Sequence, residues 1–317
     1  MNISVAIIPV TNGEPLGDCI HSIVNQRVIK ADEIRIYDSY NQADVTAIAD
    51  SYKTKIIPYT QENESSKNTH MDLIRKIVDD SNDDDILILI SDDSRIDPSA
   101  ISELFCYFLK YNDLAMIYGR QIADQDCNHL TRYVHNVFYP ITQRNYPVWH
   151  LMRILSTFKL VAYRVKFLKQ PNIMPEPETD VGDFGFLYIG GRLAEKGYRT
   201  MYNPLAISHV HRKLNAKYVY AYCRGLYRFL KMNDWLTDKW WLRQSDLETF
   251  FYNFKEYIKN YSSIPFVSFY ATICFIAAKI GEMLAEIDYQ RSLKRKAIDG
   301  KALIATTLFD KDEKLYK

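Results

Sequence analysis

The fold is decided by residues 83–98, which read DDDILILISDDSRIDP. The aliphatic run over residues 86–90 predicts a strand that is buried on both faces, as strands of a parallel sheet are. The run leads into Asp92 and Asp93, and Asp97 with the proline after it predicts the first turn of a helix, with Asp97 as N-cap. Two hard oxygen donors at the carboxyl end of a central strand favour Mg²⁺ or Mn²⁺ carrying a phosphate. Taken alone, such a pair is more often an ordinary polar loop, because loop aspartate is common.

Strand and helix patterns alternate around this stretch, which predicts an α/β fold with a right-handed, mostly parallel central sheet. Because the carboxyl ends of parallel strands share one edge, Thr11, Asp38, residues 67–68 and the aspartate pair are expected to converge on one crevice. The sequence has no G-x-G-x-x-G and no P-loop pattern, which counts against dinucleotide and P-loop readings. The expected strands cover 3–10, 34–37, 55–59 and 86–90, and the helices between them cover 16–24, 43–52 and 70–78. A later helix is expected to follow residues 182–185 and to run through Arg192 to Gly197, where glycine ends it.

Composition narrows the class of protein further. The 317 residues suffice for one large domain, or for one domain with an extension. The 40 Lys and Arg residues nearly balance the 39 Asp and Glu residues, so the charge does not indicate a nucleic-acid partner. The five cysteines form no C-x-x-C pair, which counts against a zinc site and a disulfide framework and favours a reducing compartment. The first residues carry no signal-peptide pattern, so a cytoplasmic protein is expected.

The chain changes character after residue 212, where aromatic and basic residues become frequent in helical patterns. Residues 264–278 are strongly apolar, but this run is too short and too often interrupted for a membrane span. Apolar helices flanked by Trp, Tyr and basic residues suit a helix lying on an anionic membrane surface. They suit equally a helical subdomain that packs on the sheet or forms a homo-oligomer.

Five motifs stand in order along the chain, and together they resemble the family-two glycosyltransferases, which have the GT-A fold. The pattern looks closest to bacterial rhamnosyl- and galactofuranosyl-transferase-like members. This resemblance implies a Rossmann-like catalytic domain with helices on both faces of the sheet over residues 1–212, and a C-terminal helical region over 213–317. The motifs are VAIIPVTN at 5–12, EIRIYD at 33–38, SKN at 66–68, SDDSRIDP at 91–98, and GY at 197–198 with the proline and histidine at 204 and 209.

The resemblance implies transfer of a sugar from a nucleoside diphosphate, UDP or dTDP, to an acceptor hydroxyl, with inversion at the anomeric carbon. A divalent cation, Mn²⁺ or Mg²⁺, would offset the charge of the departing diphosphate. Asp93 takes the last position of the family's D-x-D motif and is the expected metal ligand, while Asp92 is expected to contact the donor. Ser91 replaces the first aspartate and is a weak ligand, so His209 is the expected second ligand and His211 a lesser candidate.

The acceptor hydroxyl needs a base, and Asp183 is the carboxylate closest to the family's position for it. Asp180 and Glu178 remain alternatives, and by itself Asp183 also suits a helix N-cap. Arg192 suits a salt bridge as well as it suits a substrate contact. Asp38 suits the imide N–H of uracil or thymine, and Lys67 suits a phosphate. The expected substrate-binding residues are Thr11, Asn12, Glu14, Asp38, Lys67, Asp92 and Arg192.

Taken together, the sequence predicts an inverting, metal-dependent glycosyltransferase that acts on a lipid-linked glycan acceptor in surface polysaccharide synthesis. It would be cytoplasmic, or peripheral on the cytoplasmic face of the inner membrane. Two alternatives remain. One is a catalytically silent nucleotide-sugar-binding or scaffold subunit, which the lost first aspartate favours. The other is a sugar nucleotidyltransferase, which would need a glycine-rich loop that residues 11–14 do not provide.

Overall fold

The computed structural model describes residues 1–8, 15–38, 51–52, 55–58, 69–124, 126–127, 160–176 and 184–210, with single positions at 47 and 132 and between 217 and 291. Strands and helices alternate over the first half of the chain, which confirms the predicted α/β class. The expected helix over 43–52 lies largely outside the described residues. The elements are β1 (Ile3–Ile8), α1 (Leu16–Val24), β2 (Glu33–Asp38), β3 (Lys55–Pro58), α3 (Thr69–Asp79), β4 (Ile86–Ser91), β5 (Ser94–Ile96), α4 (Ala100–Lys110), β6 (Leu114–Ala123), β7 (Val161–Arg164), α6 (Val165–Leu168), α7 (Gly185–Glu195) and β8 (Arg199–Val210).

One central sheet carries these strands in the order β3-β2-β1-β4-β7-β6-β8-β5. The half formed by β3, β2, β1 and β4 is parallel throughout, as the alternation of strand and helix predicts. Beyond β4 the sheet is mixed, because β7 runs antiparallel to both β4 and β6, and β5 runs antiparallel to β8. The expectation of a mostly parallel sheet therefore holds for the N-terminal half.

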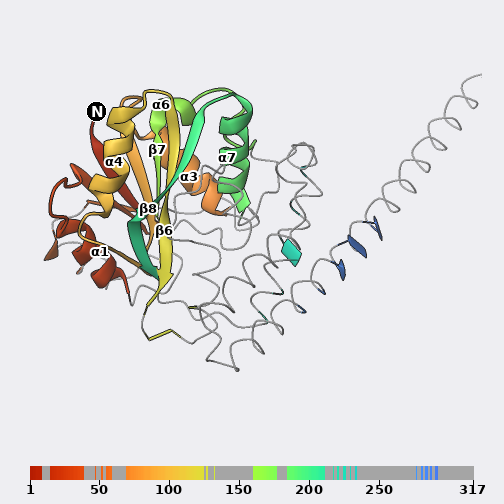
Figure 1. Cartoon of the computed structure of the whole chain (residues 1–317), viewed down its shortest axis with the longest axis horizontal. Helices are drawn as coiled ribbons and strands as arrows, with labels where there is room; N and C mark the ends of the chain where they lie inside the picture. The colour runs from red at the N-terminus through yellow and green to blue at the C-terminus, as the bar shows by residue number, and fades with distance from the viewer. Residues whose placement is uncertain are drawn as a thin grey trace, which may run out of the picture.

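Helices cover both faces of this sheet, with α1 and α4 on one side and α3 and α7 on the other (Figure 1). The pleat of the strands explains the division, since successive side chains point to opposite faces. In β6, Ile117 belongs to the core that α1 and α4 help to build. Its neighbour Met116 instead faces α7, where the sulfur lies 3.5 Å from the point that a Cβ on Gly190 would occupy. All six residues of β4 are buried, because the strand lies in the middle of the sheet and is covered on both faces.

Two predictions about helix ends have different outcomes. The prediction that glycine ends the helix over 185–195 is confirmed: Gly197 has φ of +80°, and the N–H of Tyr198 donates to the carbonyl of Leu193 in a Schellman-type turn. The prediction that Asp97 caps the next helix after β4 is wrong. That helix, α4, has Ser99 at its N-cap position, and a short strand, β5, stands between the aspartate pair and the helix.

The C-terminal region is described only at single positions. Those between 276 and 291 are helical, and Ile276, Ile280, Met283 and Ile287 expose between 38% and 56% of their surface. In the part of the chain that the structure describes, no helix is both long and apolar enough to cross a membrane. The division of the chain at residue 212 stays a prediction.

Candidate functional site

The aspartate pair forms the turn between β4 and β5. Ser91, the last residue of β4, pairs with Ile8 at the end of β1, and the N–H of Asp92 donates to the Ile8 carbonyl at 3.1 Å. Although they lie in a turn, Asp92 and Asp93 expose only 2% and 4% of their surface. Burial of a carboxylate is unfavourable unless polar groups compensate it, so this turn is a built feature and not an ordinary solvated loop.

Serine hydroxyls supply part of that compensation. The hydroxyl of Ser91 donates to Oδ1 of Asp93 at 2.6 Å, and it lies 2.9 Å from the hydroxyl of Ser94. All three side chains are buried. Sequence reasoning treated Ser91 only as a weak metal ligand in place of an aspartate. In the structure it is a hydrogen-bond donor that orients the remaining carboxylate.

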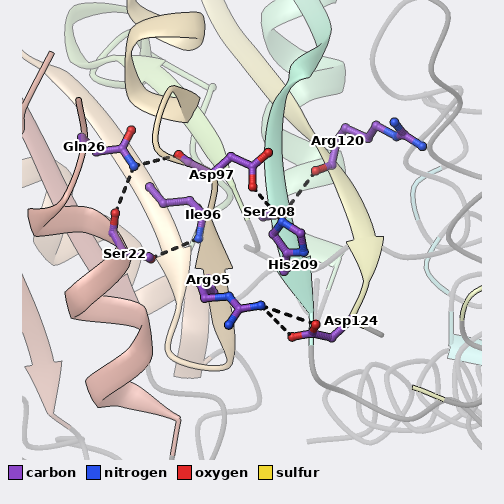
Figure 2. Close-up of polar contacts among 9 residues, drawn as sticks. All are labelled: Ser22, Gln26, Arg95, Ile96, Asp97, Arg120, Asp124, Ser208 and His209. Atoms are coloured by element: carbon purple, nitrogen blue, oxygen red, sulfur yellow. Dashed lines mark hydrogen bonds and ion pairs between the residues drawn. The ribbon is translucent and has the colours of Figure 1, made fainter. Parts of the chain in front are cut away.

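The strand after the turn, β5, is held by β8 (Figure 2). Ser94 pairs with Val210, and Arg95 pairs with His209. An ion pair and a hydrogen bond reinforce the ladder: Arg95 contacts Asp124 at 3.3 Å, and Nε2 of His209 lies 2.7 Å from Oδ1 of Asp97. None of these pairs was expected from the sequence, because they join residues that lie far apart in the chain.

His209, the predicted second metal ligand, has a protein partner in the structure. Its Nε2 contacts the carboxylate of Asp97, and the two side chains point toward one another (Figure 2). The strand β8 ends one residue later at Val210, opposite the serine that follows the aspartate turn. Among the described residues, no group of three or more His, Cys, Asp or Glu side chains is placed to hold a metal ion. Metal ligation by Asp93 and His209 therefore stays a prediction.

Arg192 lies on α7, where its contacts are those of a salt bridge. Its guanidinium pairs with Glu195 at 2.8 Å, donates to the Tyr188 hydroxyl at 3.3 Å and stacks over the Tyr188 ring. Burial acts to lower the pKa of Arg192, but the hydrogen bonds to Tyr188 and Glu195 prevail and raise it above its usual value. Of the two sequence interpretations the structure shows the salt bridge, and a substrate contact stays a prediction.

The backbone brings two of the predicted site segments to one edge of the sheet. The strands β2, β1 and β4 are parallel neighbours, so Asp38 at the end of β2 and Ser91 at the end of β4 lie at the same edge. The side chain of Asp38 is not among those described. Thr11, Asn12, Glu14, Lys67, Asp183 and its alternatives Asp180 and Glu178 all lie outside the described residues.

The role of two residues in the site was not predicted from the sequence. Ser22 lies on the otherwise apolar face of α1, where Leu16, Ile20 and Ile23 pack into the core, and Gln26 lies two residues after the end of that helix. Both polar side chains are buried and bond to the segment that follows the aspartate turn. A serine on the core-facing stripe of a helix was the available signal, since such groups are buried only with partners.

A mixed α/β sheet with a buried acidic turn at the carboxyl edge of its parallel half defines the nucleotide-sugar-binding class of fold called GT-A. The family model described as "Glycosyl transferase family 2" matches residues 5–169, more than half of the 317-residue chain. The chain belongs to this family, as the sequence motifs implied, and it is a nucleotide-sugar glycosyltransferase by class. The match does not distinguish the rhamnosyl- and galactofuranosyl-transferase-like subtype.

Solved structures of low sequence identity share the fold. The mannosyltransferase PcManGT from Pyrobaculum calidifontis, solved in complex with GDP-Man and Mn²⁺, has a TM-score of 0.52 at 10% identity, over 89% of this chain and 87% of that one. TarS 1–349 from S. aureus has a TM-score of 0.51 at 11% identity, over 92% of both chains. No curated protein is significantly similar to the chain in sequence.

Proposed function

We propose that the protein is an inverting glycosyltransferase that moves a sugar from UDP or dTDP to an acceptor hydroxyl at the carboxyl edge of the sheet. The observation that carries this proposal is the buried turn at Asp92 and Asp93, whose carboxylates are held at the ligand-binding edge of an open α/β sheet. A scaffold subunit that binds no nucleotide sugar would have no use for two carboxylates kept out of water at this point.

The acidic turn fits a divalent cation. Asp93 offers a hard carboxylate oxygen, and a carboxylate has about four lone-pair sites, so the bond from Ser91 is compatible with metal ligation. A bound Mn²⁺ or Mg²⁺ would neutralise the departing diphosphate. The GDP-Man and Mn²⁺ in the PcManGT structure support this choice of ion class. His209 remains a candidate ligand, although its Nε2 contacts Asp97. His211, which follows Val210 in the sequence, is the second candidate, because Val210 pairs with the serine after the aspartate turn.

The remaining roles follow the motif positions. Asp183, with Asp180 and Glu178 as alternatives, would accept the proton of the acceptor hydroxyl as it attacks the anomeric carbon. Asp38 would accept the imide N–H of the nucleobase, which favours uracil or thymine. Its place at the end of β2, beside β1, supports that role. Lys67 would contact the diphosphate.

The acceptor is proposed to be a lipid-linked glycan of surface polysaccharide synthesis, reached from the cytoplasmic face of the membrane. The support is the exposed apolar stripe in the C-terminal region, Ile276, Ile280, Met283 and Ile287, whose spacings of four, three and four residues place it on one helix face. A stripe of this kind suits either a membrane surface or a second copy of the chain.

Donor hydrolysis tests the proposal. Wild-type protein with Mn²⁺ is expected to release UDP or dTDP from one member of a panel of nucleotide sugars. Asp93→Ala is expected to abolish release, because the diphosphate charge is no longer neutralised. Asp84→Ala, which removes an exposed carboxylate just before the amino end of β4, is the matched control and should retain the wild-type rate.

The base is tested by transfer to an acceptor. Asp183→Asn should bind nucleotide and Mn²⁺ as the wild type does and lose transfer. Wild-type transfer rates in Asp183→Asn would move the assignment to Asp180 or Glu178. Mn²⁺-dependent nucleotide binding without donor hydrolysis or transfer in the wild type would favour the silent nucleotide-sugar-binding subunit, and absence of nucleotide binding would refute the enzyme and favour a scaffold. Pyrophosphate release from a nucleoside triphosphate and a sugar phosphate would identify the nucleotidyltransferase.

A further inference from the structure

Among the strands that the structure describes, the one that follows the aspartate turn is the last of the sheet, and its free edge is bonded by side chains from α1 and from the segment just after that helix. On one side β5 pairs with β8. On the other side the N–H of Ile96 donates to the hydroxyl of Ser22 at 3.1 Å, and the carbonyl of Asp97 accepts from Nε2 of Gln26 at 2.8 Å (Figure 2). One side chain of α1 and one from the segment just after it thereby satisfy backbone groups that an edge strand leaves unpaired.

Gln26 uses both ends of its amide. Its Nε2 donates a second hydrogen bond to the carbonyl of Ser22 at 3.0 Å, and its Oε1 accepts from the N–H of Ile101 at 3.0 Å. Ile101 lies in the first turn of α4, where Ser99 makes no side-chain capping bond. Gln26 therefore acts as a cap for α4 that is supplied by the segment just after α1. It exposes only 2% of its surface, so these bonds face little competition from water.

These contacts hold the far end of the short segment that carries the acidic turn. Ile96 is three residues beyond Asp93, and Ser94 between them bonds to Ser91. At the near end the turn is fixed by the β1–β4 ladder. The backbone on both sides of the two carboxylates is thus tied to α1 and β1, and Cys19 of α1 adds a contact to the Ser91 carbonyl at 3.6 Å.

We infer that Ser22 and Gln26 are positioning residues of the transferase, which set the backbone of the acidic turn so that Asp93 meets the cation in one geometry. This inference rests on the proposed role of Asp93. The physical reason is preorganisation, since ligands held by a bonded outer shell bind a metal more tightly than ligands on a mobile turn. Two fully bonded polar side chains, one on α1 and one just after it, also specify one placement of this segment against the strand, which apolar residues do not.

The test uses the full chain and two readouts. The first is the Mn²⁺ concentration that half-saturates the thermal shift of the protein in the presence of UDP or dTDP, and the second is amide hydrogen exchange over residues 92–97. Ser22→Ala removes the partner of the Ile96 N–H, and Ser22→Thr retains a hydroxyl. Ser81→Ala is the matched control. This serine is buried and donates to a helix carbonyl, that of Ile77, but it lies just after α3.

Ser22→Ala is expected to speed exchange over residues 92–97 and to raise the half-saturating Mn²⁺ concentration about tenfold, as loss of an outer-shell partner does. Ser22→Thr should restore both values, and Ser81→Ala should change neither. Gln26→Glu should behave as Ser22→Ala does, because it retains an acceptor for Ile101 but loses both donors. A lower melting temperature in Ser22→Ala with unchanged exchange over 92–97 and unchanged Mn²⁺ dependence would overturn the inference. No Mn²⁺ effect in the wild type would instead overturn the proposed function, and the exchange result would still report whether α1 holds the turn.

Discussion

The hydroxyl of Ser91 offers the sharpest test of how this site is built. Ser91→Ala removes the donor to Oδ1 of Asp93, a bond of 2.6 Å between two buried groups, and the contact with Ser94. The aspartate is left with one partner fewer in a place that water barely reaches. The substitution therefore separates orientation of the carboxylate from its charge, which Asp93 retains.

The magnitude follows from the type of bond. A hydrogen bond to a charged group contributes about 1.5–3 kcal/mol, so the free energy of unfolding of Ser91→Ala should fall by that amount. The melting temperature should fall by roughly 2–4 °C for each kcal/mol in a large domain. If the hydroxyl also orients Asp93 for the cation, the half-saturating Mn²⁺ concentration should rise at least about tenfold.

Urea unfolding and Mn²⁺-dependent thermal shifts measure both effects, and Ser4→Ala is the control. Ser4 is a buried serine of β1, the strand next to β4, and its hydroxyl has no hydrogen-bond partner. Ser4→Ala removes the same atom and breaks no bond, so its stability should be unchanged or slightly higher. Equal stability losses in the two variants would refute the reasoning. Unchanged Mn²⁺ dependence in Ser91→Ala would show that the bond is structural only.

Two further predictions concern the scaffold. Burial, and to a lesser degree Tyr118, raise the pKa of Tyr163, whose hydroxyl has no partner. The free energy of unfolding is therefore not reduced by this group below about pH 10 and declines above it, because the unfolded chain then releases a proton that the native state retains. Melting temperatures between pH 7 and 11 should decline less steeply in Tyr163→Phe than in the wild type, and an identical pH dependence of the two proteins would contradict this. Gly197→Ala should lower the free energy of unfolding by about 1–2 kcal/mol through its positive φ alone, since no atom lies within 4 Å of the new Cβ. Gly17→Ala, in equally open space but within α1, should not destabilise, and equal losses in urea unfolding of the two would show that backbone strain is not the cause.

The sequence predictions that the structure confirms depend on patterns among neighbouring residues in the chain. The apolar run over 86–90 required a strand with two covered faces, and only the middle of a sheet supplies that. The glycine at 197 ended a helix because its left-handed φ is a property of the residue itself. Both inferences needed no knowledge of residues elsewhere in the chain, which is why they succeeded.

The failures have the opposite character. The Asp-Pro pair at 97–98 had the local pattern of a helix start, but it directly follows the strand β5, which forms because β8, more than a hundred residues later, pairs with it, and the helix begins only at Ala100. The same pairing draws the carboxylate of Asp97 to His209 and leaves Gln26 to cap α4. Strand order and register beyond β4 are set by contacts between distant segments, and no local pattern contains them.

The replacement of the first family aspartate by Ser91 has a physical reading that separates an enzyme from a silent relative. A third carboxylate in this buried turn would add charge that only a cation relieves, whereas a serine hydroxyl neutralises part of the charge on Asp93 by donating to it. If the turn had lost its role, nothing would favour keeping Asp92 and Asp93 buried at a cost in solvation, because exposed or apolar residues would fold more easily. The retained carboxylates, the hydroxyl that orients one of them and the side chains of Ser22 and Gln26 that hold the next strand form one consistent arrangement. Such an arrangement keeps the Asp93 carboxylate in place until a cation binds, which a transferase requires and a scaffold does not.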